Sequence, residues 1–510
     1  MKRSWFRALL LRRVQVLFLL ILQLCFLFFI FQNESFIAQV LRSVVHIISG
    51  FLVLYIISKK DKGANKVIWI FLILLFPLFG SLLYILYNFQ ASTRKFEQKI
   101  FQIGQKNRTL YGLPGSAEKS AYYEAPAHIP QIRYLKYAGF PVYDDTQTEY
   151  LSPGEKFFPI FLEELKKAQK YIFIEYFIIK EGLMWQSILD ILKEKVSQGV
   201  EVRVIYDDIG CFLALPKDYA MQLKNIGIKC EVFNPFRPVL TPIQNNRDHR
   251  KITVIDGKVA FTGGLNLSDE YINTYEKHGY WKDAVIQIKG KAAWSLTLMF
   301  LEMWELCCGI PDDIECFFPK NEVDERIESD GFVQPYSDSP VDNENVGEHV
   351  YLQIINNAKD YVYICTPYLI VDDSMVSALC LAAKSGVDVR IITPHIYDKA
   401  LIHLTTRSFY RELIYGGVKI YEYSKGFMHS KIFVSDDQIA TVGTTNLDFR
   451  SLYLHFECGV WMYNSKAVLQ IKKDYFDTLN ECTQITLEEC IERLPIRVFQ
   501  EILRIFAPLM

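Results

Sequence analysis

Residues 249–256 read His-Arg-Lys-Ile-Thr-Val-Ile-Asp, and residues 429–436 read His-Ser-Lys-Ile-Phe-Val-Ser-Asp. Each stretch is followed, six residues later, by a Gly-containing turn that ends in Asn: Gly263-Gly-Leu-Asn266 and Gly443-Thr-Thr-Asn446. The segments upstream are also repeated. Residues 168–174, 200–205 and 227–233 resemble residues 358–364, 387–392 and 417–423. The chain therefore contains two copies of one sequence unit.

The repeated unit predicts an α/β fold. In each half a run of β-branched residues is followed by a helical stretch (185–197 and 374–383) and by further short strands. Alternating strands and helices are typical of layered α/β domains. We expect two halves related by a pseudo-twofold axis, each a mixed β-sheet flanked by helices, with any site between them built from both. We place the halves at 146–310 and 348–510, joined by an acidic connecting loop at 311–347 and preceded by a linker at 91–145.

The first ninety residues predict a membrane anchor. Three apolar stretches, 14–31, 36–57 and 67–87, approach or reach the roughly 20 residues that cross a bilayer. A cleaved signal peptide is the alternative for the first stretch, but no small-residue cleavage site follows it. The positive-inside rule puts the loop from Lys59 to Lys66 in the cytoplasm. Three transmembrane helices would then place all residues after Tyr87 on the extracytoplasmic side of a bacterial cell membrane. With two transmembrane helices instead of three, the N-terminus would lie on the opposite side of the membrane.

The charge distribution argues against a nucleic-acid partner. Residues 1–90 hold ten Lys or Arg and two acidic residues, a net charge of +8, so the other 420 residues carry −10 of the total of −2. A protein that binds nucleic acid normally has a basic functional domain. The 11 Cys show no paired spacing, so we expect neither a metal site nor a disulfide framework.

The repeated motif predicts a pocket for a phosphodiester. Residues two apart on a strand point to the same face, so each His and the Lys that follows it project together. The Asn residues after the turns can reach the same face. Paired across the pseudo-twofold, the set supplies two imidazoles, two ammonium groups and two amides: His249, Lys251, Asn266, His429, Lys431 and Asn446. One His would attack phosphorus and the other would protonate the leaving alkoxide, while the lysines supply positive charge without a metal or cofactor.

Four carboxylates complete the candidate site. Asp256 and Asp436 close the two motifs at strand ends, where we expect them to brace the backbone rather than touch substrate. A nucleophilic His needs a carboxylate on its far nitrogen to fix its orientation. Asp283, 34 residues after His249, and Glu457, 28 residues after His429, are the candidates.

The doubled HxKxxxxD motif with its Gly turn and Asn resembles the phospholipase D superfamily, and residues 69–84, 234–236, 247–251, 263–271 and 445–451 are similar to bacterial cardiolipin synthases. That resemblance implies that two phosphatidylglycerols give cardiolipin and glycerol through a phosphatidyl-histidine, without a metal, and it favours the first-half His249 as nucleophile. Two departures bear on acceptor preference: Asp248 and His455 stand where this family usually has Asn.

Other functions stay open at this point. A hydrolytic phospholipase D, or another phosphatidyltransferase of the superfamily, would use the same residues with a different acceptor. A nuclease is disfavoured by the acidic charge and the apolar N-terminus. An inactive membrane scaffold would be expected to lose a motif His or Lys, and all are present.

Overall fold

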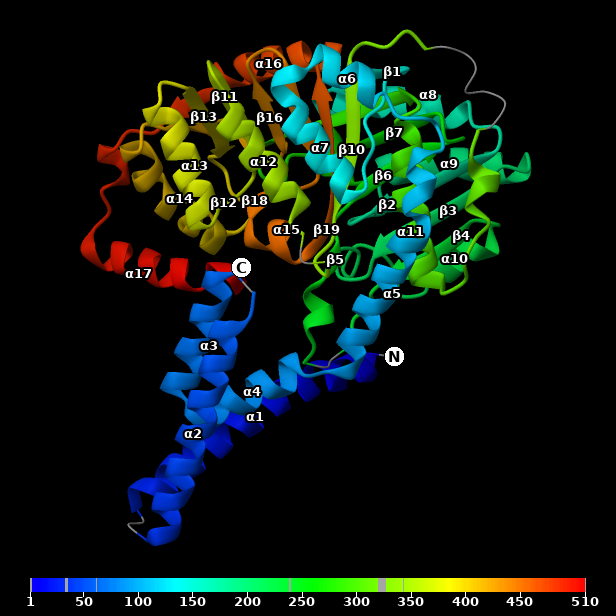
Figure 1. Ribbon diagram of the computed structural model, residues 1–510. Helices are drawn as coiled ribbons and strands as arrows, with labels where there is room; N and C mark the ends of the chain where they lie inside the picture. Colours follow the sequence, from blue (N-terminus) through cyan, green and yellow to red (C-terminus); the bar gives the residue numbers. More distant parts are fainter. Residues whose placement is uncertain are drawn as a thin grey trace. The chain divides into compact units, whose positions relative to one another are not determined.

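The computed structural model describes residues 2–32, 35–60, 62–237, 240–319, 327–342 and 344–509 (Figure 1). The chain separates into two compact units. A helical unit comprises Met1–Gln98, Phe236–Asn246 and Glu501–Met510, and a catalytic unit comprises Lys99–Pro235 and Arg247–Gln500.

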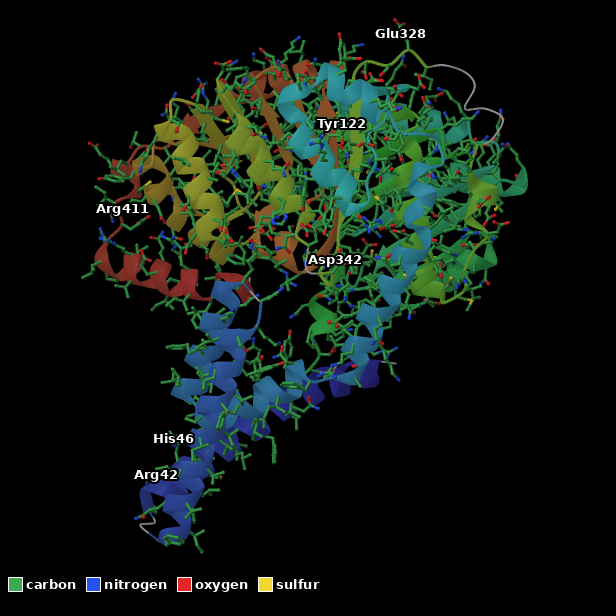
Figure 2. All side chains as sticks on the ribbon, viewed as in Figure 1. Arg42, His46, Tyr122, Glu328, Asp342 and Arg411 are labelled. Atoms are coloured by element: carbon green, nitrogen blue, oxygen red, sulfur yellow. The ribbon has the colours of Figure 1, made fainter. Side chains whose placement is uncertain are left out.

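The helical unit contains apolar helices. They are α1 (Lys2–Gln32), α2 (Phe36–Ser58), α3 (Gly63–Leu75) and α4 (Pro77–Asn88). Among the described residues, α2 alone is long and apolar enough to cross a membrane. It carries Arg42 and His46, labelled in Figure 2, and His46 Nδ1 lies 2.8 Å from the Arg42 carbonyl oxygen. The structure therefore supports one candidate span, at the position of the second predicted one.

The prediction of a single span over residues 67–87 is wrong, because the chain breaks at Phe76. Pro77 begins α4, where its missing N–H costs nothing, and the helix restarts in a new direction. Gly80 lets α4 approach α3 closely: a Cβ there would lie 2.6 Å from the Leu72 carbonyl oxygen. The α4 end returns beside the α3 start, with the Tyr84 and Trp69 ring centroids 5.1 Å apart. The pair is a helical hairpin, and its second helix ends near the start of the Lys59–Lys66 segment, since the Lys59 ammonium lies 5.8 Å from the Tyr84 ring centroid.

The catalytic unit holds two mixed sheets, side by side in Figure 1, which share one strand order except that the second sheet has an additional edge strand, β20. The first runs β1 (Thr146–Leu151), β9 (Val285–Gly290), β7 (Val259–Gly263), β6 (Lys251–Ile255), β2 (Tyr171–Tyr176), β3 (Glu201–Asp207), β4 (Lys229–Phe233). The second runs β10 (Phe332–Asp338), β19 (His455–Tyr463), β17 (Ile439–Gly443), β16 (Ile432–Ser435), β11 (Tyr361–Cys365), β13 (Asp388–Pro394), β14 (Lys419–Tyr423), β20 (Cys482–Gln484). The predicted α/β fold of two similar halves is confirmed.

Helices flank both sheets. The first half has α8 (Gly154–Lys166), α9 (Leu183–Ser197), α10 (Tyr219–Asn225) and α11 (Ala293–Cys308), and the second has α12 (Val346–Asn357), α13 (Asp373–Lys384), α14 (Ala400–Tyr415), α15 (Phe449–Tyr453) and α16 (Lys466–Leu479). Aromatic stacking joins helix to sheet in both halves: Phe300 on Phe173 at 4.6 Å, and Tyr475 on Tyr363 at 4.9 Å. Helix α17 (Leu494–Ile505) and a short 3₁₀ helix (Ala507–Leu509) follow.

The segments expected as linker and connecting loop contain ordered elements. Residues 91–145 form α5 (Ala91–Asn107), α6 (Glu118–Glu124) and α7 (Ile129–Ala138). Gln131 is fully buried and donates to the Val350 carbonyl oxygen. Strand β10 lies inside the expected acidic loop and forms the edge of the second sheet. Part of that loop, 320–326 and 343, lies outside the described residues.

Short parallel strands connect the halves directly before each motif histidine. Strand β5 (Arg247–Asp248) pairs with β19 of the second half, and β15 (Gly426–Met428) pairs with β8 (Tyr280–Lys282) of the first. The His249 N–H donates to the Phe456 carbonyl oxygen at 3.0 Å, and the His429 N–H donates to that of Lys282 at 2.8 Å. Each motif histidine is therefore positioned by the opposite half.

Candidate active site

Each motif histidine lies in a buried aromatic environment between two strands, β5 and β6 for His249 and β15 and β16 for His429. The His249 ring centroid is 5.0 Å from that of Phe177 and 5.5 Å from that of His455. The His429 ring centroid is 5.2 Å from that of Trp281 and 5.6 Å from that of Tyr271. Neighbouring rings restrict rotation of both imidazoles.

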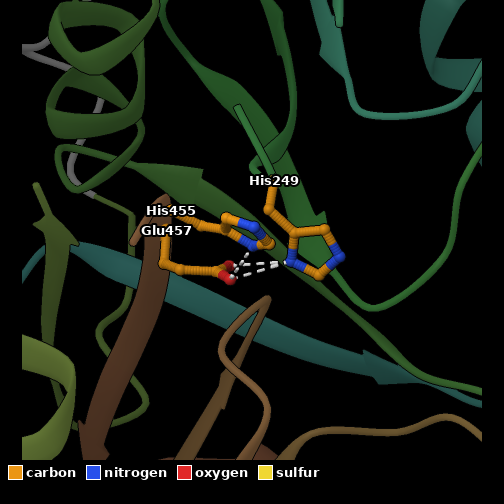
Figure 3. Close-up of side chains that lie close together, drawn as sticks. All are labelled: His249, His455 and Glu457. Atoms are coloured by element: carbon orange, nitrogen blue, oxygen red, sulfur yellow. Dashed lines mark hydrogen bonds and ion pairs between the residues drawn. The ribbon is translucent and has the colours of Figure 1, made fainter. Parts of the chain in front are cut away.

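The carboxylate partners are crossed between the halves. His249 Nδ1 lies 2.9 and 3.1 Å from the two carboxylate oxygens of Glu457 (Figure 3), and His429 Nδ1 lies 2.6 Å from Asp283 Oδ2. Both carboxylates proposed from sequence are thus imidazole partners, but each serves the histidine of the other half. The contacts occupy Nδ1, which leaves Nε2 as the nitrogen for chemistry.

The two lysines are buried beside the histidines. Lys251 donates to the His249 carbonyl oxygen, and Lys431 Nζ lies 2.9 Å from His429 Nδ1. Burial lowers the pKa of Lys251 to about 8 and that of Lys431 to about 7, because both ammonium groups are removed from water. An anionic ligand beside these lysines would therefore favour their protonated, positively charged forms.

Electrostatics connect the two motifs into one cluster. Burial holds the pKa of His249 and of His429 well below the ordinary value, and the ammonium groups of Lys251 and Lys431 lower both further. Burial also raises the pKa of Asp283 and of Glu457 to about 7. Both imidazoles are thus neutral at pH 7, the state in which a ring nitrogen can act as nucleophile or base.

The aspartates that close the motifs lie at the far ends of their strands. Asp256 accepts backbone hydrogen bonds from Gln169, Lys170 and Tyr171, at 2.7–2.8 Å. Asp436 accepts the equivalent bonds from residues 359–361, at 2.8–3.0 Å. Both aspartates therefore brace the backbone, as expected; that they do not touch substrate stays a prediction.

The motif asparagines are buried within the same region, but their amides are engaged in local structure. Asn266 Oδ1 accepts from the Ile178 N–H at 3.0 Å, and its Nδ2 donates to the Tyr271 hydroxyl at 2.6 Å. Asn446 Nδ2 donates to Asp448 at 2.9 Å, while its Oδ1 is buried without a hydrogen-bond partner among the described residues. Asn266 therefore holds the loops around the site, and Asn446 retains one unmatched acceptor.

Sequence reasoning missed the Thr444 hydroxyl, which donates to Glu457 Oε2. The first copy has Gly264 at this position, and a Cβ there would lie 2.0 Å from Asp283 Oδ1. The two carboxylates are therefore held differently. Comparison of the two turns, Gly-Gly-Leu-Asn against Gly-Thr-Thr-Asn, contains this signal.

Asp248, one of the two departures noted in the sequence, belongs to a buried ion cluster. It accepts from Arg250 Nε at 3.4 Å, and Arg250 also pairs with Glu175 at 2.7 Å. Residues 248 and 250 alternate with His249 along the chain. The cluster therefore supports the segment that carries the histidine.

A metal-like grouping overlaps this site. His249, His455 and Glu457 each offer one ligand atom within 4.8 Å of the others (Figure 3). Two lysine ammonium groups act electrostatically on the same histidine, and they oppose the binding of a further cation. The donor set fits a metal poorly.

Comparisons with known proteins agree with this geometry. A family model described as "Cardiolipin synthase, PLD-like domain" matches residues 161–297 and 351–479, and one described as "Phospholipase_D-nuclease N-terminal" matches residues 47–87. The chain is 43% identical to an uncharacterized protein of Streptococcus mutans, over 90% of this chain and 99% of that protein.

Named relatives and one solved structure extend the comparison. The chain is 35% identical to a cardiolipin synthase of a Geobacillus species (90% of this chain, 92% of that one) and 33% identical to cardiolipin synthase 2 of Bacillus anthracis (91% and 90%). The crystal structure of a phosphatidylserine synthase of Haemophilus influenzae shares the fold at 14% identity, with a TM-score of 0.57 over 74% of this chain and 100% of that one.

Proposed function

The chain belongs to the cardiolipin synthase family of the phospholipase D superfamily, and from that premise we propose that it joins two phosphatidylglycerols into cardiolipin and glycerol. Family membership makes it a phosphatidyltransferase that acts on phospholipids. The observation that carries the finer proposal is the crossed pair of carboxylate-held histidines, each with a buried lysine beside it.

The proposed reaction has two displacements at phosphorus. Binding of the phosphodiester anion favours uptake of a proton by His429. In the first displacement His249 Nε2 then attacks phosphorus, the bond to the glycerol headgroup breaks, and His429 gives that proton to the leaving oxygen. In the second, His429 takes the proton from a hydroxyl of the acceptor lipid. That oxygen bonds to phosphorus while the bond to His249 Nε2 breaks.

The remaining polar groups support this chemistry. Lys251 and Lys431 stabilise the negative charge that develops on the non-bridging oxygens, and binding of the phosphate favours their protonated forms. Glu457 and Asp283 stabilise the imidazolium ions that form during each displacement, as an orienting carboxylate does in other histidine sites.

Two alternatives share most of this site. A hydrolytic phospholipase D would transfer the phosphatidyl group to water, and an inactive scaffold would not catalyse phosphatidyl transfer. The intact set of two histidines, two lysines and two carboxylates argues against the scaffold.

The test is to supply phosphatidylglycerol to the purified full-length protein and analyse the lipids formed. Cardiolipin with glycerol is expected, phosphatidic acid would indicate hydrolysis, and no product would contradict both enzymes. His249→Ala should remove the product. His349→Ala is the matched control, because His349 is half-exposed and contacts Glu344 and Tyr134 instead of the motif residues.

The side of the membrane on which the catalytic unit lies also has to be reconsidered. The extracytoplasmic prediction required residues 67–87 to cross the bilayer as a third span, and those residues form a hairpin instead. The chain after α4 returns to the side of the Lys59–Lys66 loop, which the positive-inside rule assigns to the cytoplasm. We therefore propose a cytoplasmic catalytic unit.

A further inference from the structure

The loop between β13 and α14 carries a lysine that acts electrostatically on both histidines. Lys399 is exposed, with its side chain 66% accessible, and its ammonium lies 3.8 Å from Asp398 Oδ2. Burial is the largest cause of the lowered pKa of His249 and of His429, and the charge of Lys399 is a smaller cause for both. Lys399 therefore lies outside the buried cluster but within its electrostatic reach.

Contacts place this loop on the His429 side of the site. The Lys399 ammonium lies 5.7 Å from the ring centroid of Tyr368, whose hydroxyl donates to Asp398 at 2.8 Å. The Tyr368 ring centroid is 6.4 Å from that of Phe427, which in turn is 5.6 Å from that of His429. The charge of Asp398 also acts on His429, where it raises the pKa against the larger effects of burial and the lysines.

The corresponding loop in the first half follows β3 and has a different character. It contains the exposed apolar side chains Ile209, Phe212 and Leu213. It packs beside Phe177, because the Cys211 thiol donates to the Phe177 carbonyl oxygen, and Phe177 contacts His249. The two histidines are thus flanked by loops that are not equivalent, an apolar one near His249 and one with an exposed ammonium near His429.

Such asymmetry is useful for a reaction that uses the same lipid twice in different roles. In the second displacement, the attacking hydroxyl of the acceptor must lie at His429, which takes its proton. The acceptor's own phosphate is separated from that hydroxyl by the carbons of one glycerol, so it lies within the length of one glycerol from His429. A phosphodiester anion there needs a cation, and an exposed lysine ammonium supplies one.

We propose that Lys399 binds the phosphate of the acceptor lipid and so favours an anionic phospholipid over water or a neutral alcohol in the second displacement. This inference rests on the proposed function. The exposed apolar side chains that flank the lysine, Tyr397 and Leu401, are suited to the acyl region of the same lipid. Because the charge of Lys399 also acts on both histidines, its removal can change the rate at which the phosphatidyl-enzyme forms, but that step precedes the partition among acceptors.

The test measures how one phosphatidyl-enzyme partitions among three acceptors. The full-length protein receives labelled phosphatidylglycerol in mixed micelles with excess labelled glycerol, and the products of transfer to lipid, to glycerol and to water are quantified together. A hydrogen bond to a charged group contributes about 1.5–3 kcal/mol, so Lys399→Gln is expected to lower the ratio of lipid transfer to glycerol transfer about tenfold or more. Total turnover into glycerol and water should persist.

Two further variants control for charge and position. Lys399→Arg should retain most of the wild-type ratio, and Lys217→Gln, in the exposed loop after β3, should leave it unchanged. A wild-type ratio in Lys399→Gln would overturn this inference alone, as would an equal loss of lipid and glycerol transfer. Absence of all three products from the wild-type protein would overturn the proposed function, and this inference with it.

Discussion

Replacing Glu457 by Gln tests whether the crossed carboxylate sustains catalysis at His249. The substitution keeps the shape of the side chain and removes its charge. The Gln carbonyl oxygen can still accept from the Thr444 hydroxyl, which now donates to Glu457. The largest change is at the contact with His249 Nδ1, at 2.9 and 3.1 Å, and the charge is also lost beside His455, whose Nδ1 lies 3.9 Å away.

The expected loss of turnover has two parts. Removing a hydrogen bond to a charged group forfeits about 1.5–3 kcal/mol, which corresponds to roughly 10- to 150-fold in rate. An amide that donates to Nδ1 would also put the proton on Nε2 and remove the nucleophilic lone pair; where a triad depends on its carboxylate, this costs about 10⁴ in kcat. We expect a loss of about 10³- to 10⁴-fold.

The same substitution lowers activity but should leave the thermal stability unchanged or raise it. Burial raises the pKa of Glu457 from 4.5 to about 7. A carboxyl whose folded pKa lies above its unfolded value destabilises the fold as pH rises through that interval, since the unfolded state ionises first. A neutral Gln has no such cost, so Tm at pH 8 should be unchanged or higher.

The assay is the initial rate of cardiolipin formation from phosphatidylglycerol, with Tm measured on the same samples. Glu422→Gln is the matched control, because Glu422 is also buried and also lies at a histidine Nδ1 (His395, 2.8 Å), outside the cluster. A rate within about threefold of wild type for Glu457→Gln would refute the reasoning. A loss of activity accompanied by a large loss of Tm would assign Glu457 a structural role instead.

Three further predictions follow from the same geometry. His429→Ala should abolish turnover yet accumulate phosphatidyl-enzyme on His249, detectable as labelled phosphate on protein; label on His429 in the wild type would reverse the two roles. The value of kcat/KM should fall above about pH 7 and more steeply above about pH 8, because Lys431 and Lys251, with pKa values of about 7 and 8, lose their protons in the free enzyme; a flat profile to pH 10 would contradict this. Single cysteines at Lys60 and at Glu328, the latter labelled in Figure 2, should both resist an impermeant thiol reagent in intact cells; labelling at Glu328 alone would restore the extracytoplasmic topology.

Local periodicity and repetition were sufficient to predict the fold of the catalytic unit. The helices expected at 185–197 and 374–383 appear as α9 and α13, because each has a strongly amphipathic pattern between buried strands. The doubled motif likewise identified the histidines and lysines of the site, and the search for a carboxylate downstream of each motif identified Asp283 and Glu457.

Features that depend on long-range packing were not predictable in this way. The exchange of Asp283 and Glu457 between the halves arises from the pairing of β5 with β19 and of β15 with β8, which a one-dimensional spacing cannot reveal. The hairpin at 63–88 was missed because hydropathy alone was counted, although Pro77 and Gly80 are local signals for a break and a close helix approach. The linker helices were not predicted, because residues such as Gln131 are polar yet buried through tertiary contacts.

The exchange of strands and carboxylates between the halves determines how a mutation in one half affects the other, and whether one half can function alone. A lesion at position 457 in the second half disables the histidine of the first, so damage is not confined to the half that carries it. A fragment with one intact motif would be inert by itself, since its histidine would lack an orienting partner. Two separately expressed fragments could recover activity only by reassociating through the β5–β19 and β15–β8 pairings.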